Sequence, residues 1–329
     1  MYAISVIIPC YNAGNYLPAC LASLRVQRVA DAQFLFIDDG SSDATGRMLD
    51  EFARIEPRAC VIHQKNAGVS AARNRGIALA QGKYLAFLDA DDAYEEDALE
   101  RLYCLAEKTG AEIVSADHTI FEERTQQRRA VVQTPPPSSA ADVVEWILGM
   151  HRIYNNLWNK LYVKTLFDRP SMRLNEEIRI GEDAALNLQL YLSARRIAHL
   201  SERTYVYRVH KNSAMASVPG GYARAHERML QNMALTLSRW GVKEKYFERF
   251  LMSAMWIDEK EKGVFQAAAD FEAHVRPLLV SGIDAQKLSG EGKRLYRLIG
   301  MGLFPAYYIA RHARIKLQRQ LRRRDKKKQ

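Results

Sequence analysis

Cysteine is scarce in this chain, and it is not arranged as a metal site or a redox pair. The 329 residues contain four cysteines, Cys10, Cys20, Cys60 and Cys104. None belongs to a CxxC pair, and none stands at metal-ligand spacing from a histidine. We therefore expect no disulfide framework and no zinc site, and the pattern is typical of reduced thiols in a cytosolic protein.

Long hydrophobic runs are also absent. The longest uncharged apolar stretch, residues 298–310, contains Pro305 and is too short to cross a bilayer. The first residues lead directly into an apolar strand pattern without a basic segment, so we expect no secretory signal. With 48% hydrophobic residues, the chain still has enough apolar side chains for the core of a large α/β domain and a smaller second part.

An excess of positive charge is nearly absent outside one segment. The formal net charge is +10, and residues 311–329 hold ten Lys or Arg and a single Asp, which accounts for +9 of it. Because the rest of the chain has no basic excess, we expect no nucleic-acid partner. Apolar residues at helical spacing continue through this basic stretch, which predicts an amphipathic tail over residues 294–329 that associates with an anionic membrane surface. Packing of its apolar face on the rest of the protein is the alternative.

Short apolar runs alternate with helical patterns over the first 120 residues. This alternation predicts an α/β fold with a mainly parallel sheet and helices on both faces. We expect Ser70 to cap the third helix, which ends before Gly82. The predicted strands share an enrichment in β-branched and aromatic residues and cover residues 4–8, 34–37, 60–63, 84–88 and 113–116.

The later part of the chain divides by composition. A proline-rich break at residues 134–139 interrupts the pattern, and from about residue 220 onward the pattern is helical without strand signals. We predict a nucleotide-binding half at residues 1–117, an acceptor-binding half at 118–219, a helical extension at 220–293 and the tail at 294–329.

Polar clusters follow four of the predicted strands. Because ligands of such sheets bind at the carboxyl ends of the strands, we expect these clusters to lie together. Each alone is also what a solvated turn or helix cap looks like, and four in succession favour a binding site. The clusters are Pro9-Cys10-Tyr11-Asn12, Asp38 to Asp43, Asn66 to Asn74 with Arg73, and Asp89-Ala90-Asp91-Asp92.

The residue types in these clusters suit one ligand class. A carboxylate accepts the ring N–H of a pyrimidine, an aromatic ring stacks on it, and Arg73 suits a base carbonyl or a phosphate. Asp89 and Asp91 carry the hard oxygens that Mn²⁺ or Mg²⁺ prefers, with Asp91 the more direct ligand. Such a metal neutralises a departing diphosphate, so the sequence predicts a nucleotide-diphosphate site.

Other functions fit these segments less well. A nicotinamide-dependent oxidoreductase needs GxGxxG after the first strand, and a sugar nucleotidyltransferase needs a glycine-rich phosphate loop there; this chain has neither. An EF-hand reading of the loop that starts at Asp89 fails because Tyr94 occupies the sixth position, which requires glycine. A non-catalytic sugar-nucleotide-binding protein stays open as a second hypothesis.

The chain resembles a family 2 glycosyltransferase with the GT-A fold, a Rossmann-like sheet, followed here by a C-terminal helical extension. The resemblance is tight over residues 3 to about 115 and loose to about 215. The motifs that carry it are Val6 to Asn12, Asp38 to Thr45, Asn66 to Gly68 with Ala72 to Gly76, and Gly82 to Asp92.

The resemblance implies a role for each matching position. Tyr11 and Asp39 contact the uracil, and Pro9 belongs to the same nucleotide-sugar site. Arg73 contacts the base or the diphosphate, Asp89 the ribose or the metal, and Asp91 the metal.

The resemblance also implies a general base, because an inverting transferase must remove the proton of the acceptor hydroxyl. Glu182-Asp183 resembles the family's acidic pair, with Asp183 the base and Glu182 a supporting contact; complementing a helix dipole is the alternative. The preceding segment Leu157 to Tyr162 is also similar to the family. Late in the domain, we predict Arg208 as a phosphate contact and His210 as a metal ligand.

The sequence therefore predicts an inverting, metal-dependent transferase of a hexose or N-acetylhexosamine. The expected donor is a UDP-sugar, with thymidine or guanosine open as the nucleoside. The expected acceptor is a hydroxyl of a growing lipopolysaccharide, capsule or exopolysaccharide, on the cytosolic face of a bacterial inner membrane, and inversion of an α-linked donor gives a β-linkage.

Overall fold

The computed structural model describes residues 2–133, 137, 139–149, 155–211, 222–251, 276, 283–304, 306–308 and 310. It divides into two compact units, Met1–Ile147 with His151–Ser217, and Leu148–Met150 with Val218–Gln329. Residues 311–329, the most basic part of the predicted tail, lie outside the described residues.

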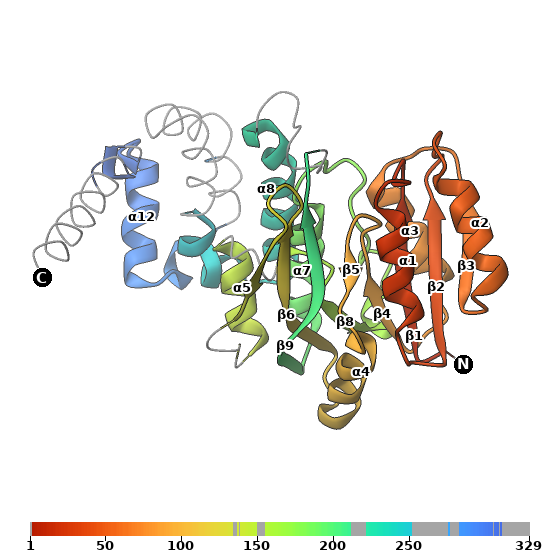
Figure 1. Cartoon of the computed structure of the whole chain (residues 1–329). Coiled ribbons are helices and arrows are strands. Elements are labelled where there is room, and N and C mark those ends of the chain that lie inside the picture. Colours follow the sequence, from red (N-terminus) through yellow and green to blue (C-terminus); the bar gives the residue numbers. More distant parts are fainter. Residues whose placement is uncertain are drawn as a thin grey trace, which may run out of the picture. The chain divides into compact units, whose positions relative to one another are not determined.

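The first unit contains a nine-stranded sheet, which Figure 1 shows with its flanking helices. The strands run in the order β3-β2-β1-β4-β8-β6-β9-β5, with β7 paired to β6. They are β1 (Ile4–Cys10), β2 (Ala32–Asp38), β3 (Ala59–His63), β4 (Tyr84–Phe87), β5 (Ala93–Tyr94), β6 (Ile113–Glu122), β7 (Gln127–Val131), β8 (Lys160–Val163) and β9 (Ile197–Val209). The helices of this unit are α1 (Leu17–Arg25), α2 (Thr45–Ile55), α3 (Val69–Leu79), α4 (Ala98–Thr109), α5 (Ala140–Leu148) and α7 (Glu182–Ser193), with the 3-10 turn η1 (Lys164–Phe167).

The α/β fold predicted from the sequence is confirmed, and the sheet is parallel in one half and mixed in the other. Strands β3, β2, β1 and β4 are parallel neighbours, whereas β8 runs antiparallel to both β4 and β6. Strand β7 is antiparallel to β6 because a short turn with Gln126 in the left-handed region folds it back as a hairpin. Local strand patterns do not reveal these directions, which depend on the connections.

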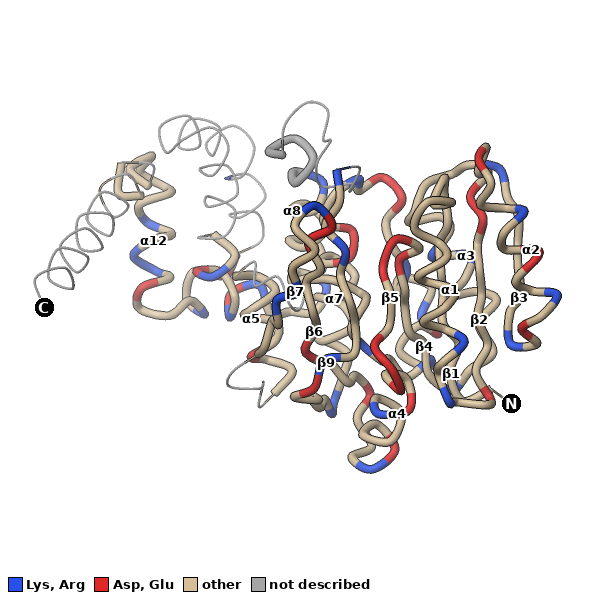
Figure 2. The backbone as a smooth tube through the Cα atoms, viewed as in Figure 1, with Lys and Arg blue, Asp and Glu red and all other residues tan. Residues whose placement is uncertain are grey.

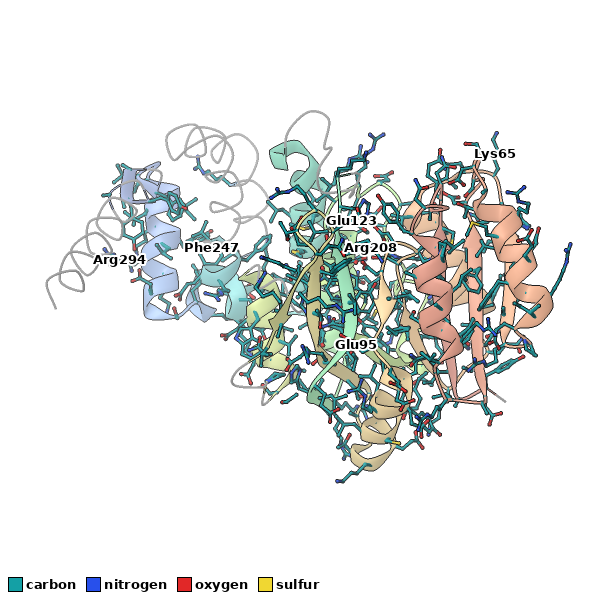
Figure 3. All side chains as sticks on the ribbon, viewed as in Figure 1. Lys65, Glu95, Glu123, Arg208, Phe247 and Arg294 are labelled. Carbon is teal, nitrogen blue, oxygen red and sulfur yellow. The ribbon has the colours of Figure 1, made fainter. Side chains whose placement is uncertain are left out.

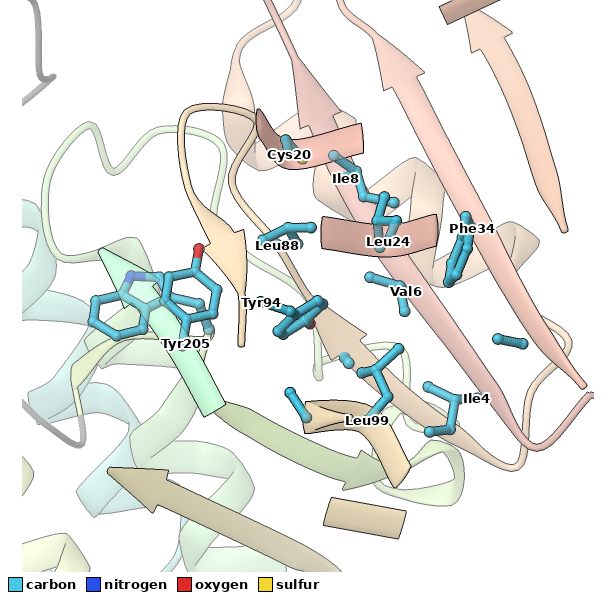
Figure 4. Close-up of a cluster of buried hydrophobic side chains, with 14 of the residues drawn as sticks. Ile4, Val6, Ile8, Cys20, Leu24, Phe34, Leu88, Tyr94, Leu99 and Tyr205 are labelled. Carbon is cyan, nitrogen blue, oxygen red and sulfur yellow. The ribbon is translucent and has the colours of Figure 1, made fainter. Parts of the chain in front are cut away.

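Successive side chains of β1 point to opposite faces of the sheet, and each face is covered. Val6 and Ile8 belong to the cluster that includes Leu24 of α1 and Leu99 of α4, part of which is labelled in Figure 4. On the other face, α3 packs so closely on Ile7 that a Cβ added at Gly76 would collide with its side chain. This packing holds the carboxyl ends of β1, β2 and β4 in a fixed arrangement.

The predicted cap of the third helix is wrong. The cap residue is Gly68, not Ser70, and its φ of +93° is a backbone conformation that side chains disfavour. Ser70 lies within the first turn and is buried. The helix therefore begins at Val69, two residues earlier than it would with Ser70 as the cap, because Gly68 makes the turn.

The second unit is helical in its described residues and has its own core. It contains α8 (Tyr222–Arg239), a short 3-10 turn η4 (Ala285–Lys287) and α12 (Gly290–Gly300). Ser289 caps α12 by accepting a hydrogen bond from Gly292 N, and Leu295 and Ile299 are buried. No helix among the described residues has the length and apolarity that a membrane span requires.

Candidate functional site: an arginine-linked acidic cluster at the strand ends

The loop after β2 is anchored through Asp39, which is buried at the strand end. Its carboxylate accepts hydrogen bonds from Gln64 Nε2 at 2.7 Å, Ala67 N at 2.9 Å and Gly68 N at 2.8 Å. Three donors on one carboxylate hold the β3–α3 loop against the end of β2. The predicted uracil contact of Asp39 stays a prediction.

The loops after β1 and β2 are joined by side-chain bonds. Asn12, in the left-handed region, accepts the backbone N–H of Ser42 on its Oδ1 at 2.8 Å. Ala13 N donates to Thr45 Oγ1 at 2.8 Å. These bonds leave Tyr11 projecting, with 55% of its surface exposed. Pro9 lies in β1, two residues beyond the last β1 residue that pairs with β4. An exposed ring beside a fixed loop is the arrangement that stacking on a base requires.

Arg73 of α3 links Asp89 to the acidic pair Glu182-Asp183, which lies far from Asp89 in the sequence. Its Nη2 donates to Asp89 Oδ1 at 2.8 Å, and its Nη1 donates to Asp183 Oδ1 at 2.8 Å and to Glu182 Oε1 at 3.1 Å. The guanidinium is buried, so these charge-assisted bonds act with little screening by water. One side chain, that of Arg73, therefore connects the predicted base with the predicted metal-binding loop.

The acidic pair Glu182-Asp183 occupies the first turn of α7. Burial raises the pKa of Asp183, an effect that Arg73 opposes, and burial together with the Asp183 charge raises the pKa of Glu182 to about 7. Leu157 N donates to Asp183 Oδ2 at 3.3 Å. A raised pKa makes the Asp183 carboxylate a stronger base, while the donors on its two oxygens hold it in one orientation.

The segment Asp89-Ala90-Asp91-Asp92 lies between β4 and β5, and Figure 2 shows acidic residues on both sides of β5. Asp91 Oδ2 lies 2.9 Å from Nε2 of His210, whose ring packs on Tyr16 with centroids 4.1 Å apart. Burial raises the pKa of Asp91, and the nearby charge of Asp89 raises it further. Asp91 thus lies beside the imidazole of His210 and is repelled by the carboxylate of Asp89. Among the described residues, no group of three or more His, Cys, Asp or Glu has metal-binding geometry.

Asp92 has a different role from its neighbours, because it is fully buried and bound to β9. Its Oδ2 accepts the Tyr205 hydroxyl at 2.7 Å, and its Oδ1 accepts Arg208 N at 2.7 Å. The same hydroxyl accepts the backbone N–H of Asp89 at 3.1 Å. Asp92 and Tyr205 therefore fix the backbone of the acidic loop against β9 and leave Asp91 at the edge.

Arg208 also contacts the acidic loop, through the backbone. Its Nε donates to the carbonyl oxygen of Asp91 at 3.0 Å, and its Nη1 lies 3.5 Å from Glu123 Oε1. Figure 3 labels Arg208, which lies in β9, and Glu123, which directly follows β6. The guanidinium also lies over the rings of Tyr16 and Phe121, at 5.8 and 5.2 Å from their centroids. The predicted phosphate contact stays a prediction, and the structure adds this backbone contact.

Several site residues were missed by the sequence analysis. Tyr205 is 113 positions from Asp92, and nothing in spacing links the two. Trp158, whose ring stacks on those of Tyr205 and Tyr207, was noted only as part of a family-like segment. That Arg73 binds the acids rather than being open toward a ligand was also not expected. The sequence offered one signal for these contacts. Asp89 and Asp91 follow a strand end, and Arg73 and the pair Glu182-Asp183 lie near the starts of helices.

The sequence of the chain matches a family model and several known proteins. The family model described as Glycosyl transferase family 2 matches residues 5–174. The chain is 33% identical over 234 residues to the uncharacterized glycosyltransferase EpsJ of Bacillus subtilis, covering 69% of this chain and 66% of EpsJ. It is 32% identical over 220 residues to the glycosyltransferase GlyA of Streptococcus pneumoniae, covering 64% of this chain and 31% of GlyA. The matches thus span less than two thirds of these relatives.

A solved structure has the same fold. Residues 1–349 of S. aureus TarS, in complex with UDP-GlcNAc, align with a TM-score of 0.73 at 17% identity, over 95% of this chain and 92% of that chain. At this identity the likeness concerns the fold, which is of the GT-A type. The family model covers just over half of the chain and includes Arg73 and Asp89 of the arginine-linked cluster, whereas Glu182 and Asp183 follow the matched region. The chain belongs to glycosyl transferase family 2.

Proposed function

We propose that this protein is an inverting, metal-dependent glycosyltransferase that moves a hexose or an N-acetylhexosamine from a UDP-sugar to a hydroxyl of a growing cell-surface glycan. The observation that carries the proposal is the contact of Arg73 with Asp89 on one side and Asp183 on the other, at 2.8 Å each. This contact joins a donor-side acid to a base candidate within one site.

The proposed base is Asp183, with Glu182 as a supporting contact. As the acceptor hydroxyl attacks the anomeric carbon, Asp183 takes its proton, an O–C bond forms, and the bond from that carbon to the diphosphate oxygen breaks. Attack from the face opposite to the leaving group inverts the configuration, so an α-linked donor gives a β-linked product. The buried setting of Asp183 supports this role because it raises the pKa of the carboxyl group.

The proposed metal ligands are Asp91, Asp89 and His210, with Mn²⁺ or Mg²⁺ as the ion. A divalent cation would supply Lewis-acid stabilisation of the departing diphosphate. Carboxylate and imidazole groups suit a hard or borderline cation, but among the described residues no three such groups stand in metal-binding geometry, so diphosphate oxygens and water would supply the remaining ligands. Burial raises the pKa of Asp91 and the nearby charge of Asp89 raises it further; a positive charge would relieve that repulsion, which supports a cation here.

The proposed donor is a UDP-sugar, held by Pro9, Tyr11 and Asp39 at the base and by Arg73 and Arg208 nearer the diphosphate. The exposure of Tyr11 and the joined loops after β1 and β2 support this assignment. The UDP-GlcNAc in the TarS structure supports the nucleotide class. The acceptor we propose is a lipopolysaccharide, capsule or exopolysaccharide, reached at the cytosolic face of a bacterial inner membrane through the basic tail.

The test is a panel of UDP-glucose, UDP-galactose, UDP-GlcNAc and UDP-GalNAc with purified protein, scored by UDP release. We expect release from at least one donor with Mn²⁺ or Mg²⁺ and none with a chelator. Asp91→Ala should lower the rate by about 100-fold or more, since the metal contributes several kcal/mol to the transition state. The matched control is Asp168→Asn, an exposed acid that follows η1. No release from any donor with either metal would refute the proposal.

A further inference from the structure

The segment Asn156 to Lys160 surrounds a buried ammonium group. Lys160, the first residue of β8, is 1% exposed, and its Nζ donates to Asn156 O at 2.7 Å and to Asn159 Oδ1 at 2.9 Å. A charged amine in the interior is costly unless such acceptors satisfy it. The lysine therefore binds back onto the residues that precede it and holds them as a turn.

The first half of this turn contacts α7 and the proposed base. Leu157 N donates to Asp183 Oδ2 at 3.3 Å, and Asn187 Nδ2, one helical turn further along α7, donates to Asn156 O at 2.9 Å. The carbonyl of Asn156 thus accepts from both Lys160 and Asn187. The orientation of the Leu157 N–H toward Asp183 depends on the turn that Lys160 holds.

The second half of the turn contacts the other side of the site. Asn159 has a φ of +55°, and its Nδ2 donates to Ala116 O of β6 at 2.6 Å. Trp158 stacks on Tyr205 with ring centroids 4.6 Å apart. Tyr205 in turn binds the acidic loop, so one short turn joins α7 to the strand that supports the proposed metal ligands.

We propose that Lys160 is a positioning residue for Asp183: it folds the turn that presents Leu157 N–H to the carboxylate, and it places a positive charge near the base. The proposal rests on the proposed function, because it assigns Lys160 a role toward the same base. Lys160 does not touch the reacting atoms.

The charges around the two groups support this role. Lys160 and Arg73 both lower the pKa of Asp183, against the effects of burial and of Asp89. Glu182 is the remaining charged neighbour on α7, and its own pKa is raised. Two histidines also interact with Lys160. Burial lowers the pKa values of His118 of β6 and His199 of β9, and the charge of Lys160 lowers them further. Burial lowers the pKa of Lys160 itself to about 7, whereas Asp183 raises it.

The experiment compares Lys160→Met with Lys243→Met, a second buried lysine that lies in the other unit. For Lys160→Met we expect kcat for UDP release to fall by about 10- to 100-fold, the scale of losing the positioning of a catalytic group. The donor KM and the Kd for UDP should stay within about twofold, because the donor contacts are untouched. The acid limb of the kcat profile should move to higher pH. Lys243→Met should match the wild type in all four quantities.

Lys160→Gln separates the effect of the charge from that of the hydrogen bonds. It also tests the proposal if the methionine variant does not fold. Its amide keeps donors near Asn156, so we expect the shift of the acid limb with a smaller loss of kcat. The proposal is overturned if a folded Lys160 variant keeps the wild-type kcat and the wild-type acid limb. A lowered Tm in that variant would show that Lys160 has a structural role instead. Absence of UDP release from the wild-type protein refutes the proposed function instead, so the two failures are distinguishable.

Discussion

At the scale of single residues, Arg73 determines how the acids of the site are arranged. The planar guanidinium reaches Asp89 with one nitrogen and both Glu182 and Asp183 with the other. A lysine has a single nitrogen in place of the planar group of donors, so it would not bind the acids in this geometry. The buried Arg73 cation also favours the ionised form of Asp183, which a base requires.

The substitution Asp183→Asn tests whether this single residue is the general base. The amide cannot take a proton, so we expect kcat for UDP release to fall by about 10²- to 10⁴-fold while UDP binding by calorimetry stays unchanged. In the wild type, kcat should be lost as the pH falls through the raised pKa of Asp183, because the protonated carboxyl is no longer a base. Asp168→Asn is the control for a neutralised acid elsewhere. Wild-type turnover by Asp183→Asn would remove Asp183 from the mechanism.

At the scale of elements, the strand ends are joined by short polar contacts rather than by the sheet alone. His63, the last residue of β3, has Nδ1 2.8 Å from Asp38 Oδ2 at the end of β2 and Nε2 3.1 Å from Asp50 Oδ1 of α2. The hydrogen bond to Asp38, followed by that to Asp50, raises the pKa of His63. The imidazole ring of His63 therefore connects β2, β3 and α2 beside the loop that contains Asp39.

His63→Gln tests this connection through the pH dependence of stability. A histidine whose pKa is raised by folding contributes stability that is fully present below its unfolded pKa of about 6.5 and is lost as the pH rises through the folded pKa. We expect the variant to melt about 1–3 °C below the wild type at pH 5.5, a small gap because His63 is half-exposed, and the gap to close by pH 8.5. Arg54 and His63 line the same pocket, and Arg54→Gln, which removes a positive charge there without removing a histidine, should show a gap independent of pH. A His63→Gln gap that does not change with pH would contradict the assignment.

At the scale of the whole molecule, the charge of the chain is concentrated in a segment outside the described residues. Residues 311–329 hold ten of the 48 Lys and Arg. Leu295 and Ile299, two apolar residues of the predicted tail that lie in α12, are buried, whereas Met301 and Leu303 after α12 are exposed. The membrane-associating part of the tail is therefore expected beyond α12.

Deletion of residues 311–329 tests this proposal without removing the buried face of α12. We expect the full chain to sediment with vesicles containing phosphatidylglycerol, less at high salt, and the truncated chain to stay in the supernatant. UDP release in solution should be the same for both. The control replaces the ten Lys and Arg with Gln at full length, which should also abolish sedimentation. Equal recovery of the truncated chain with the vesicles would show that the tail is not the contact.

The sequence by itself determined the α/β fold, most of the strands in the first unit and the start of α7. These depend on local patterns: apolar runs such as Ile4 to Ile8, and acids at a helix start such as Glu182. Turn chemistry was less predictable, since Gly68 rather than Ser70 precedes α3. The antiparallel direction of β8 was also not predictable, because it depends on how the chain returns to the sheet.

Only the tertiary structure decided which polar residues meet. Arg73 and Asp183 are 110 positions apart, Asp92 and Tyr205 are 113 apart, and Lys160 holds the turn that contacts the base. Hydrophobic periodicity is a local property and specifies elements, whereas these contacts depend on how α3, α7 and β9 pack around the carboxyl ends of the strands. The sequence therefore indicated which residues carry the chemistry, and the fold decided which of them act on one another.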